Sequence, residues 1–369
     1  MLGYSGLMDA FNLQCPPPRR LTALASVGRN TTVVSGGTEW MLLPRNPGLK
    51  IPNTPMEHLG VALKHEGVDL RVLNRLFECG VEQELTAYIN ANRAGIYTRR
   101  AWFLYEWMTG RQLQVQEPYG AQYVPALDPI KYFTHGATRS TRHKVDDNMP
   151  GVPGFCPLIR RTERLADHRI AGLAEEARAA VSNADPAVLR RAVGFMLLNE
   201  SRGSFGIEGE TPPRSRLDRW GRVIAEARDI KLSIPALETL HRSLFDPKQV
   251  FTRFGLRTAG GFMGRHDARD QAPVPDHVCA RPEDLHSLLG GVLAAYDRLR
   301  DGFDPILCAA LIGFGFVVIH PFEDGNGRLH RFLFQKALAD MGFNPDDVIL
   351  PVSAAILEDY SVPTLPYID

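Results

Sequence analysis

The chain has 369 residues, of which 44% are hydrophobic and 23% charged, as is usual for a globular protein. Basic and acidic residues number 42 each, so the net charge of zero gives no support for binding to nucleic acid or to an anionic membrane. Five widely spaced cysteines without a CxxC pair disfavour a disulfide framework, and the N-terminus lacks a signal-peptide pattern; both favour the cytoplasm.

Residues 1–145 are predicted to form a mostly helical N-terminal region of unknown role. Two short β-like runs, Thr31–Ser35 and Thr38–Leu43, meet at a glycine pair and indicate a hairpin. Residues 55–115 have apolar and aromatic residues at helical spacing, which predicts helices with these side chains in the core.

Residues 146–230 are predicted to be a linker followed by helices. Proline, glycine and aspartate are frequent over residues 116–160, which favours a linker along the surface. Helical spacing then recurs over residues 162–182, 185–202 and 216–229.

Residues 231–369 are predicted to form the last part of the chain, and the whole fold is expected to be mainly α. Glycines between β-like residues favour a hairpin over Phe254–Gly264. The apolar run 306–319 is too short to cross a bilayer and fits a buried helix. Helices are predicted at 234–244, 283–299, 305–319 and 328–341.

The stretch His320-Pro-Phe-Glu-Asp-Gly-Asn-Gly-Arg-Leu-His-Arg331 joins two of these helices. Its Gly325–Gly327 segment opens the second helix, so backbone N–H groups and the positive end of the helix dipole converge on a site suited to phosphate. Arg328 and Arg331 lie at i and i+3, where two guanidinium groups would hold further phosphate oxygens.

The remaining polar groups of this stretch complete a phosphoryl-transfer site. Asp324 offers a hard oxygen ligand suited to Mg²⁺. His320 has the ordinary pKa of about 6.5 that suits a general base toward a hydroxyl nucleophile. Phe322 is interpreted as the apolar side chain that fixes the loop to the core, and His330 is predicted to face solvent. Together these groups describe transfer of a phosphate-linked group to a hydroxyl.

The stretch resembles the Fic family signature, H-x-F-x-(D/E)-G-N-G-R-x-x-R, at every fixed position. Fic proteins are mostly AMP transferases that move AMP from ATP to Ser, Thr or Tyr hydroxyls. The resemblance implies that residues 231–369 are a Fic-type catalytic core, which is helical with a small β-hairpin flap. It also implies ATP and Mg²⁺ as substrate and cofactor, and a phosphate site made by Gly325, Asn326 and Gly327.

A second segment, Ser204-Phe-Gly-Ile-Glu-Gly209, resembles the family's inhibitory motif, (S/T)-x-x-x-E-(G/N). The motif residues are Ser204, Glu208 and Gly209. A carboxylate that reaches Arg331 would take the partner meant for the γ-phosphate of ATP. The alternative is an acidic helix end on the surface, which Glu210 would serve equally well.

A third segment, Leu256–Gly264, resembles the flap of the family, a hairpin whose edge can add a strand of the target protein. An ordinary glycine-rich hairpin stays open as the alternative. The residues assigned to target binding are Thr258, Ala259, Gly260, Gly261 and Phe262.

The resulting hypothesis is a Mg²⁺- and ATP-dependent protein adenylyltransferase that Glu208 inhibits, with removal of AMP as a second activity. The expected partner is a target protein that presents a hydroxyl side chain; self-modification and a homo-oligomer stay open. The alternatives are a catalytically silent nucleotide-sensing or interaction module, and a Fic enzyme that transfers another phosphate-linked group. No nucleic acid or membrane partner is expected.

Overall fold

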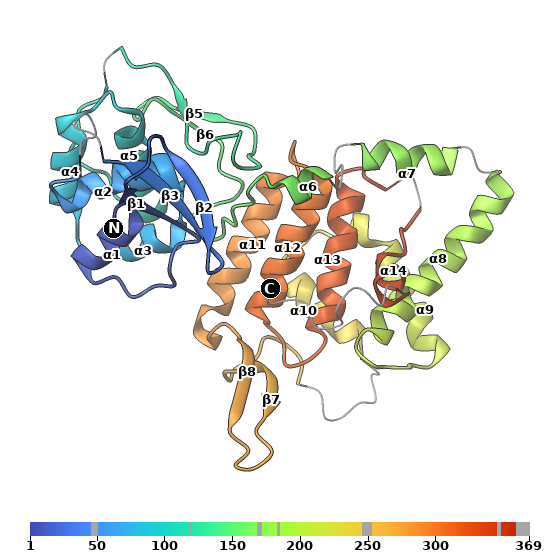
Figure 1. Cartoon of the computed structure of the whole chain (residues 1–369). Coiled ribbons are helices and arrows are strands. Elements are labelled where there is room, and N and C mark those ends of the chain that lie inside the picture. The colour runs from blue at the N-terminus through green and yellow to red at the C-terminus, as the bar shows by residue number, and fades with distance from the viewer. Residues whose placement is uncertain are drawn as a thin grey trace. The chain divides into compact units, whose positions relative to one another are not determined.

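The computed structural model describes residues 1–45, 51–118, 120–167, 172–182, 185–245, 253–344 and 348–358. The chain separates into two compact units, Met1–Met149 and Pro150–Asp369, whose elements are labelled in Figure 1. The division predicted from the sequence, at residues 145 and 230, stays a prediction. None of the helices in the described segments combines the length and the apolar character that crossing a membrane requires.

The first unit begins with helices packed on a small sheet. Its elements are α1 (Tyr4–Phe11), β1 (Arg20–Ala25), β2 (Thr31–Ser35), β3 (Thr38–Pro44), α2 (Pro55–Val61), the π-helical η1 (Ala62–Glu66), α3 (Leu70–Glu78), α4 (Glu82–Ala91) and α5 (Ile96–Thr109). The central strand β3 is parallel to β1 and antiparallel to β2, which confirms the predicted hairpin. Trp102 and Tyr105 on α5 are fully buried, so these aromatic residues belong to the core as predicted.

The segment predicted as a surface linker instead completes the first unit. It forms a second three-stranded sheet from β4 (Val124–Pro125), β5 (Thr138–Ser140) and β6 (Val145–Asp147). The Asn148 side chain accepts a hydrogen bond from the Leu127 N–H and donates one to its carbonyl, both at 2.9 Å. The polar residues that suggested a linker therefore satisfy buried backbone groups, and the surface-linker prediction is wrong here.

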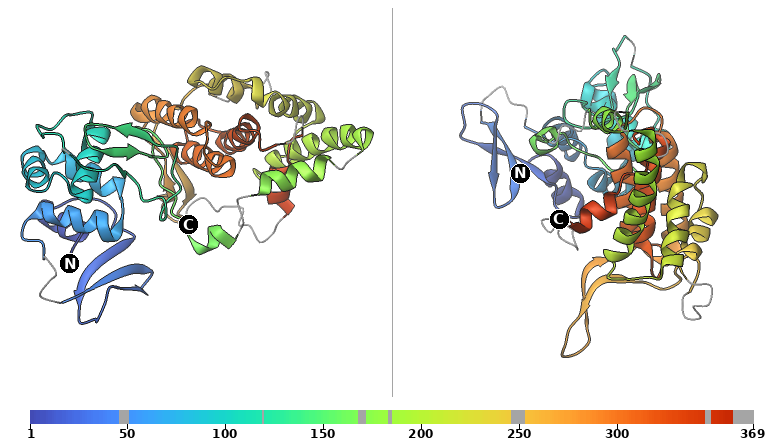
Figure 2. Two further views of the ribbon diagram at one scale, coloured as in Figure 1. Left: turned by 90° about the horizontal axis from the view of Figure 1, so that it is seen from above. Right: turned by 90° about the vertical axis from the view of Figure 1, so that its right-hand side faces the viewer.

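The second unit is helical apart from one antiparallel hairpin in its described part. Its elements are α6 (Glu163–Asp167), α7 (Leu173–Ser182), α8 (Pro186–Gly206), α9 (Arg214–Ala225), η2 (Ala227–Asp229), α10 (Ile234–Ser243), β7 (Phe262–His266), β8 (Pro273–Val278), η3 (Pro282–Asp284), α11 (Leu285–Leu299), α12 (Pro305–Ile319), α13 (Asn326–Asp340) and α14 (Val352–Glu358). Helix α12 lies between α11 and α13 and is buried along most of its length, as its apolar sequence predicted (Figures 1 and 2). The fold is thus mainly α, as expected.

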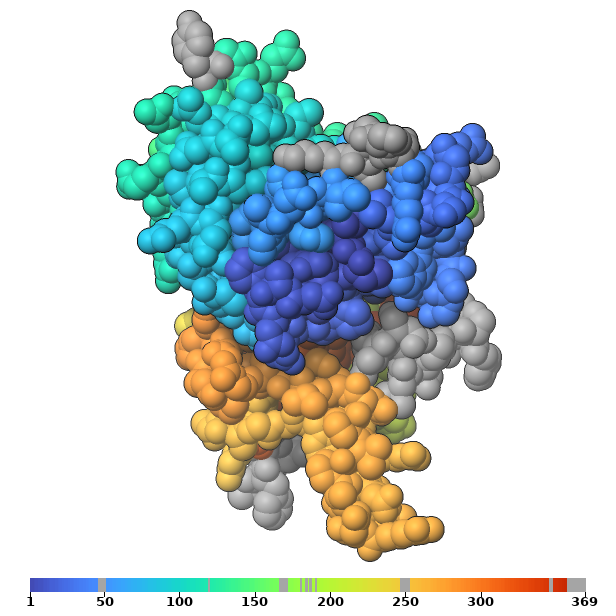
Figure 3. All heavy atoms as spheres, turned by 60° about the vertical axis from the view of Figure 1, so that its left-hand side comes forward, coloured from blue at the N-terminus to red at the C-terminus, as the bar shows by residue number. Residues whose placement is uncertain are grey.

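The hairpin lies farther along the chain than the sequence predicted. Only the last residues of Phe254–Gly264 enter β7, and the turn falls between β7 and β8. The two strands extend away from the helices of the second unit (Figure 1), and their atoms project from the molecular surface (Figure 3). In that turn Asp267 accepts a hydrogen bond from the Arg269 N–H at 2.8 Å, and Asp270 accepts one from the Ala272 N–H at 3.0 Å. The prediction followed the glycines, but these aspartates make the turn.

His330 does not face solvent, so that prediction is wrong. Its ring lies against Gly313 of α12, where an added Cβ would be 2.7 Å from the imidazole. Burial, with a smaller effect of the nearby Arg331 charge, lowers the pKa of His330 to about 4. The imidazole is therefore a neutral packing group where α12 and α13 approach closely.

Helix α14 crosses α8 at a position that admits only glycine. A Cβ on Gly203 would lie 2.5 Å from the backbone nitrogen of Ala354. One turn earlier on α8, the buried Glu200 carboxylate accepts hydrogen bonds from the Ser353 N–H at 2.7 Å and from its hydroxyl at 2.5 Å. The crossing therefore combines close backbone packing with a buried polar contact.

We predict that Gly203→Ala lowers the free energy of unfolding by about 1–3 kcal/mol, because α14 must move away from the added methyl group. Gly194 provides a matched control on the same helix, since it is exposed and has no atom within 4 Å of an added Cβ. Gly194→Ala should raise the stability by about 0.5–1 kcal/mol. Urea unfolding of both variants checks this pair, and effects of the same sign would contradict it.

Candidate active site

The loop between α12 and α13 is short and tightly bent. It leaves α12 at His320, which has a left-handed backbone conformation with φ 53° and ψ 62°. Gly325, with φ 84°, turns the chain into α13, which begins at Asn326, two residues before the predicted start. The N-terminus of α13 therefore directly follows the loop that carries His320 and Asp324, and these groups share one site.

The surroundings of His320 favour a neutral imidazole. Its Nδ1 lies 3.3 Å from the Val317 carbonyl oxygen, so a proton on Nδ1 satisfies that oxygen and leaves Nε2 as the acceptor. Burial lowers the pKa of His320, and the charges of Arg257 and His277 act in the same direction. The hydrogen bond to Val317 and the charge of Glu208 oppose this shift without reversing it. A neutral imidazole is thus favoured near neutral pH.

The backbone of His320 is stabilised by Arg257, a residue that the sequence interpretation missed. A non-glycine residue in the left-handed region costs about 1–3 kcal/mol. The Arg257 Nε donates to the His320 carbonyl at 2.7 Å, and the Arg257 backbone N–H donates to the Pro321 carbonyl at 2.9 Å. The available signal was that Arg257 is the only charged residue in the segment Leu256–Gly264.

Phe322 and Asn326 fix the middle of the loop. The Phe322 ring is fully buried and stacks on His241 of α10, with 4.2 Å between ring centroids and 8° between planes. The Asn326 side chain accepts from the Phe322 N–H at 3.0 Å and donates to its carbonyl at 2.8 Å. The His241 Nε2 lies 2.9 Å from the Asp324 carbonyl oxygen. The Asn326 side chain therefore orders the loop backbone. The expected phosphate site would then consist of the backbone N–H groups at the N-terminus of α13.

Glu208 lies at that helix N-terminus. Its Oε1 accepts a hydrogen bond from Arg331 Nη2 at 2.8 Å and would be 2.1 Å from a Cβ on Gly327. Arg331 also donates to the Ser204 hydroxyl at 3.1 Å and to the Ser204 carbonyl at 2.6 Å. Gly209, with φ 73°, turns the chain immediately after Glu208. The structure thus brings Ser204 and Glu208 of the second motif into contact with Arg331, the last residue of the first motif.

Arg328 is turned toward the interior, with 1% of its surface exposed. Its Nη1 lies 2.7 Å from Glu210 Oε1, and its Nη2 donates to Asp324 Oδ1 at 3.2 Å. The guanidinium also lies over the rings of Phe205 and Phe245. Glu210 is therefore the ion-pair partner of Arg328, whereas Glu208 is the partner of Arg331, and the two carboxylates have separate contacts.

The five residues assigned to target binding lie at the base of the hairpin. Thr258, Ala259, Gly260 and Gly261 precede β7, and Phe262 is its first residue. The hairpin is attached to the end of α12 by a contact of 2.8 Å between His277 Nε2 and the Val318 carbonyl oxygen. The base of the hairpin therefore lies next to His320.

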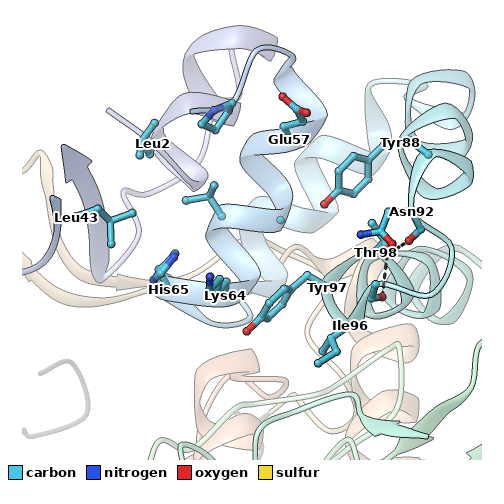
Figure 4. Close-up of a pocket in the computed structure, with 15 residues that line it drawn as sticks. Leu2, Leu43, Glu57, Lys64, His65, Tyr88, Asn92, Ile96, Tyr97 and Thr98 are labelled. Carbon is cyan, nitrogen blue, oxygen red and sulfur yellow. Dashed lines mark hydrogen bonds between the residues drawn. The ribbon is translucent and has the colours of Figure 1, made fainter. Parts of the chain in front are cut away.

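A separate cavity of about 650 Å³ lies in the first unit. Lys64, His65, Tyr88 and Tyr97 are among the residues that line it (Figure 4). It contains none of the motif residues, and its polar groups do not converge on one point (Figure 4). Chemistry rather than cavity size therefore identifies the loop from His320 to Arg331 as the candidate active site.

We predict that Asn326→Ala lowers the free energy of unfolding by about 1–3 kcal/mol, because it leaves the buried N–H and carbonyl of Phe322 without partners. Asp324→Ala in the same loop should cost less than about 1 kcal/mol, since that carboxylate is 62% exposed and its buried partner Arg328 keeps the ion pair with Glu210. Chemical unfolding of the two variants provides the comparison. Equal losses would show that the Asn326 side chain does not hold the loop.

Residues 231–338 match the family model described as Fic/DOC family. The chain is 32% identical over 123 residues to Protein adenylyltransferase fic-1 of Caenorhabditis elegans, covering 33% of this chain and 22% of that protein. It is 29% identical over 214 residues to Protein adenylyltransferase Fic of Drosophila willistoni, covering 51% of this chain and 41% of that protein. The chain thus spans less than half the length of these curated relatives.

A solved structure of a Fic family protein from Desulfovibrio desulfuricans G20 shares 19% sequence identity with the chain. The aligned region covers 55% of this chain and 65% of that structure's chain, with a TM-score of 0.42. The similarity to the Fic/DOC family is described by the match over residues 231–338 and by the sequence relatives.

Proposed function

Because residues 231–338 form a Fic/DOC family domain, we propose that this protein is a protein adenylyltransferase, which transfers AMP from ATP to a hydroxyl side chain of a target protein. The observation that carries the proposal is one loop with a neutral imidazole, an exposed carboxylate and a helix N-terminus. The described cysteines are all free thiols, which fits a reducing compartment such as the cytoplasm.

The phosphates of ATP would bind at the N-terminus of α13, where backbone N–H groups and the helix dipole favour an anion. Asp324 fits a Mg²⁺ ligand, because its side chain is 62% exposed and its Oδ2 makes no hydrogen bond within the described segments. Mg²⁺ held by Asp324 would neutralise charge on the leaving pyrophosphate.

His320 would accept the proton of the target hydroxyl at Nε2 as the hydroxyl oxygen attacks the α-phosphorus of ATP. A new P–O bond to the target forms, the bond to the β-phosphate oxygen breaks, and pyrophosphate leaves. The imidazolium then returns its proton to solvent. The lowered pKa of His320 supports this role, because the base must be unprotonated before the reaction.

Glu208 would inhibit this reaction by occupying the anion site. Its carboxylate contacts Arg331 and lies against Gly327, where a γ-phosphate would bring further negative charge. Two anions at one position repel each other, so ATP would have to displace the carboxylate or bind in a pose unsuited to transfer. Glu210 cannot replace Glu208 in this role while it pairs with Arg328.

We predict that Glu208→Gly increases labelling of protein from α-³²P-ATP by about 10- to 100-fold. This range corresponds to the loss of one charge-assisted hydrogen bond, worth about 1.5–3 kcal/mol. Glu226→Gly, which removes an exposed carboxylate at the end of α9, should leave labelling unchanged. Unchanged labelling and unchanged ATP affinity in Glu208→Gly would refute the inhibitory role.

The same assay separates the alternatives. Label from α-³²P-ATP but not from γ-³²P-ATP identifies AMP transfer, and His320→Ala in the Glu208→Gly background should abolish it. Chelation of Mg²⁺ should also abolish it. If cell lysate is supplied as the source of targets and none of the variants gives label, the catalytically silent module is the better description.

A further inference from the structure

Arg257 is a buried cation whose contacts are with backbone carbonyls. Its exposed surface is 6%, and its side chain donates to four carbonyl oxygens. The distances are 2.7 Å to His320, 2.8 Å to Ala259 and 3.3 Å to Ile319, and the fourth bond is to Ala280. A guanidinium satisfied in this way fixes the positions of all the segments that it touches.

The four carbonyls belong to two elements that are distant in sequence. Ala259 precedes β7 and Ala280 follows β8, so these two residues form the base of the hairpin. Ile319 and His320 are at the end of α12, where carbonyls lack intrahelical partners and the helix dipole favours a cation. One side chain therefore joins the hairpin to the residue that carries the proposed base.

We propose that Arg257 is a positioning residue that couples the target-binding hairpin to His320. It holds the left-handed backbone of His320, so that the imidazole points at a hydroxyl brought by the hairpin. This inference rests on the proposed adenylyl transfer. Arg257 would act on the base and on the position of the target hydroxyl and not on ATP binding, because it contacts neither Arg331 nor Glu208 within the described segments.

Lysine cannot reproduce these contacts. Guanidinium nitrogens lie in one plane and point in fixed directions, which allows simultaneous bonds to carbonyls on the hairpin and on α12. An ammonium group at the same place offers one nitrogen. Arg257→Lys therefore keeps the positive charge but loses most of the geometry, whereas Arg257→Gln loses both.

The charge of Arg257 also acts on His320. The groups that face this imidazole are Arg257, His277, Glu208 and the Val317 carbonyl, and the positive charge of Arg257 lowers the pKa of His320. Removing that charge favours the imidazolium, so His320 should stay protonated to a higher pH. Because the base acts unprotonated, the rise of the rate with pH should move to higher pH in Arg257→Gln but not in Arg257→Lys.

The kinetic test measures transfer from α-³²P-ATP against pH in the Glu208→Gly background, with cell lysate as the source of targets. Both Arg257 variants should lower kcat by about 100-fold, since a small misplacement of the base is costly. The KM for ATP should stay within about twofold. Arg222→Gln, at an exposed position on α9, should change neither parameter.

Histidine NMR titration without ATP tests the same inference independently of activity. The His320 resonances, assigned with His320→Asn, should titrate at higher pH in Arg257→Gln than in the parent and Arg257→Lys. An unchanged titration together with an unchanged kcat would overturn the proposal, as would a loss explained by unfolding or by weaker ATP binding alone. If the Glu208→Gly parent gives no label, adenylyl transfer fails, while the titration still decides the role of Arg257.

Discussion

The candidate site depends on how the charge of Arg331 is balanced. Only 5% of this residue is exposed, and a guanidinium buried to that extent requires acceptors around it. Ser204 and Glu208 supply them from the end of α8, a helix more than a hundred residues earlier in the chain. The same contact orders the segment Ser204–Gly209, places the Glu208 carboxylate at the N-terminus of α13 and connects two distant parts of the second unit.

The loop before Arg331 is constrained from three directions. The Phe322 ring stacks on His241, and the Asn326 side chain forms hydrogen bonds with the Phe322 backbone. Arg257 donates a hydrogen bond to the carbonyl of His320, the first residue of the loop. These contacts favour a preorganised loop. The Asp324 side chain, by contrast, is 62% exposed.

The groups of the loop could be predicted because they are adjacent in sequence. The turn and the start of α13 need only local geometry, so twelve residues are enough to predict them, while the roles of His320 and of the phosphate site stay predictions. The Arg331–Glu208 pair was predictable only through a second motif. Arg257, His241 and the Arg328–Glu210 pair act through contacts between distant segments and have no local signature. The hairpin was predicted too early in the chain, because the prediction followed the glycines of Phe254–Gly264. Its turn lies between β7 and β8, where the side chains of Asp267 and Asp270 accept backbone hydrogen bonds.

The crossing of α8 and α14 supports the segment Ser204–Gly209. Gly203, where the two backbones meet, is the residue before Ser204, and Glu200 bonds to α14 one turn earlier. Helix α8 thus contacts Arg331 through Ser204 and contacts α14 through the preceding residue and the turn before it. A movement of α14 away from α8 would act on the same turn of helix that positions Ser204, and would weaken the hydrogen bonds of Ser204 to Arg331.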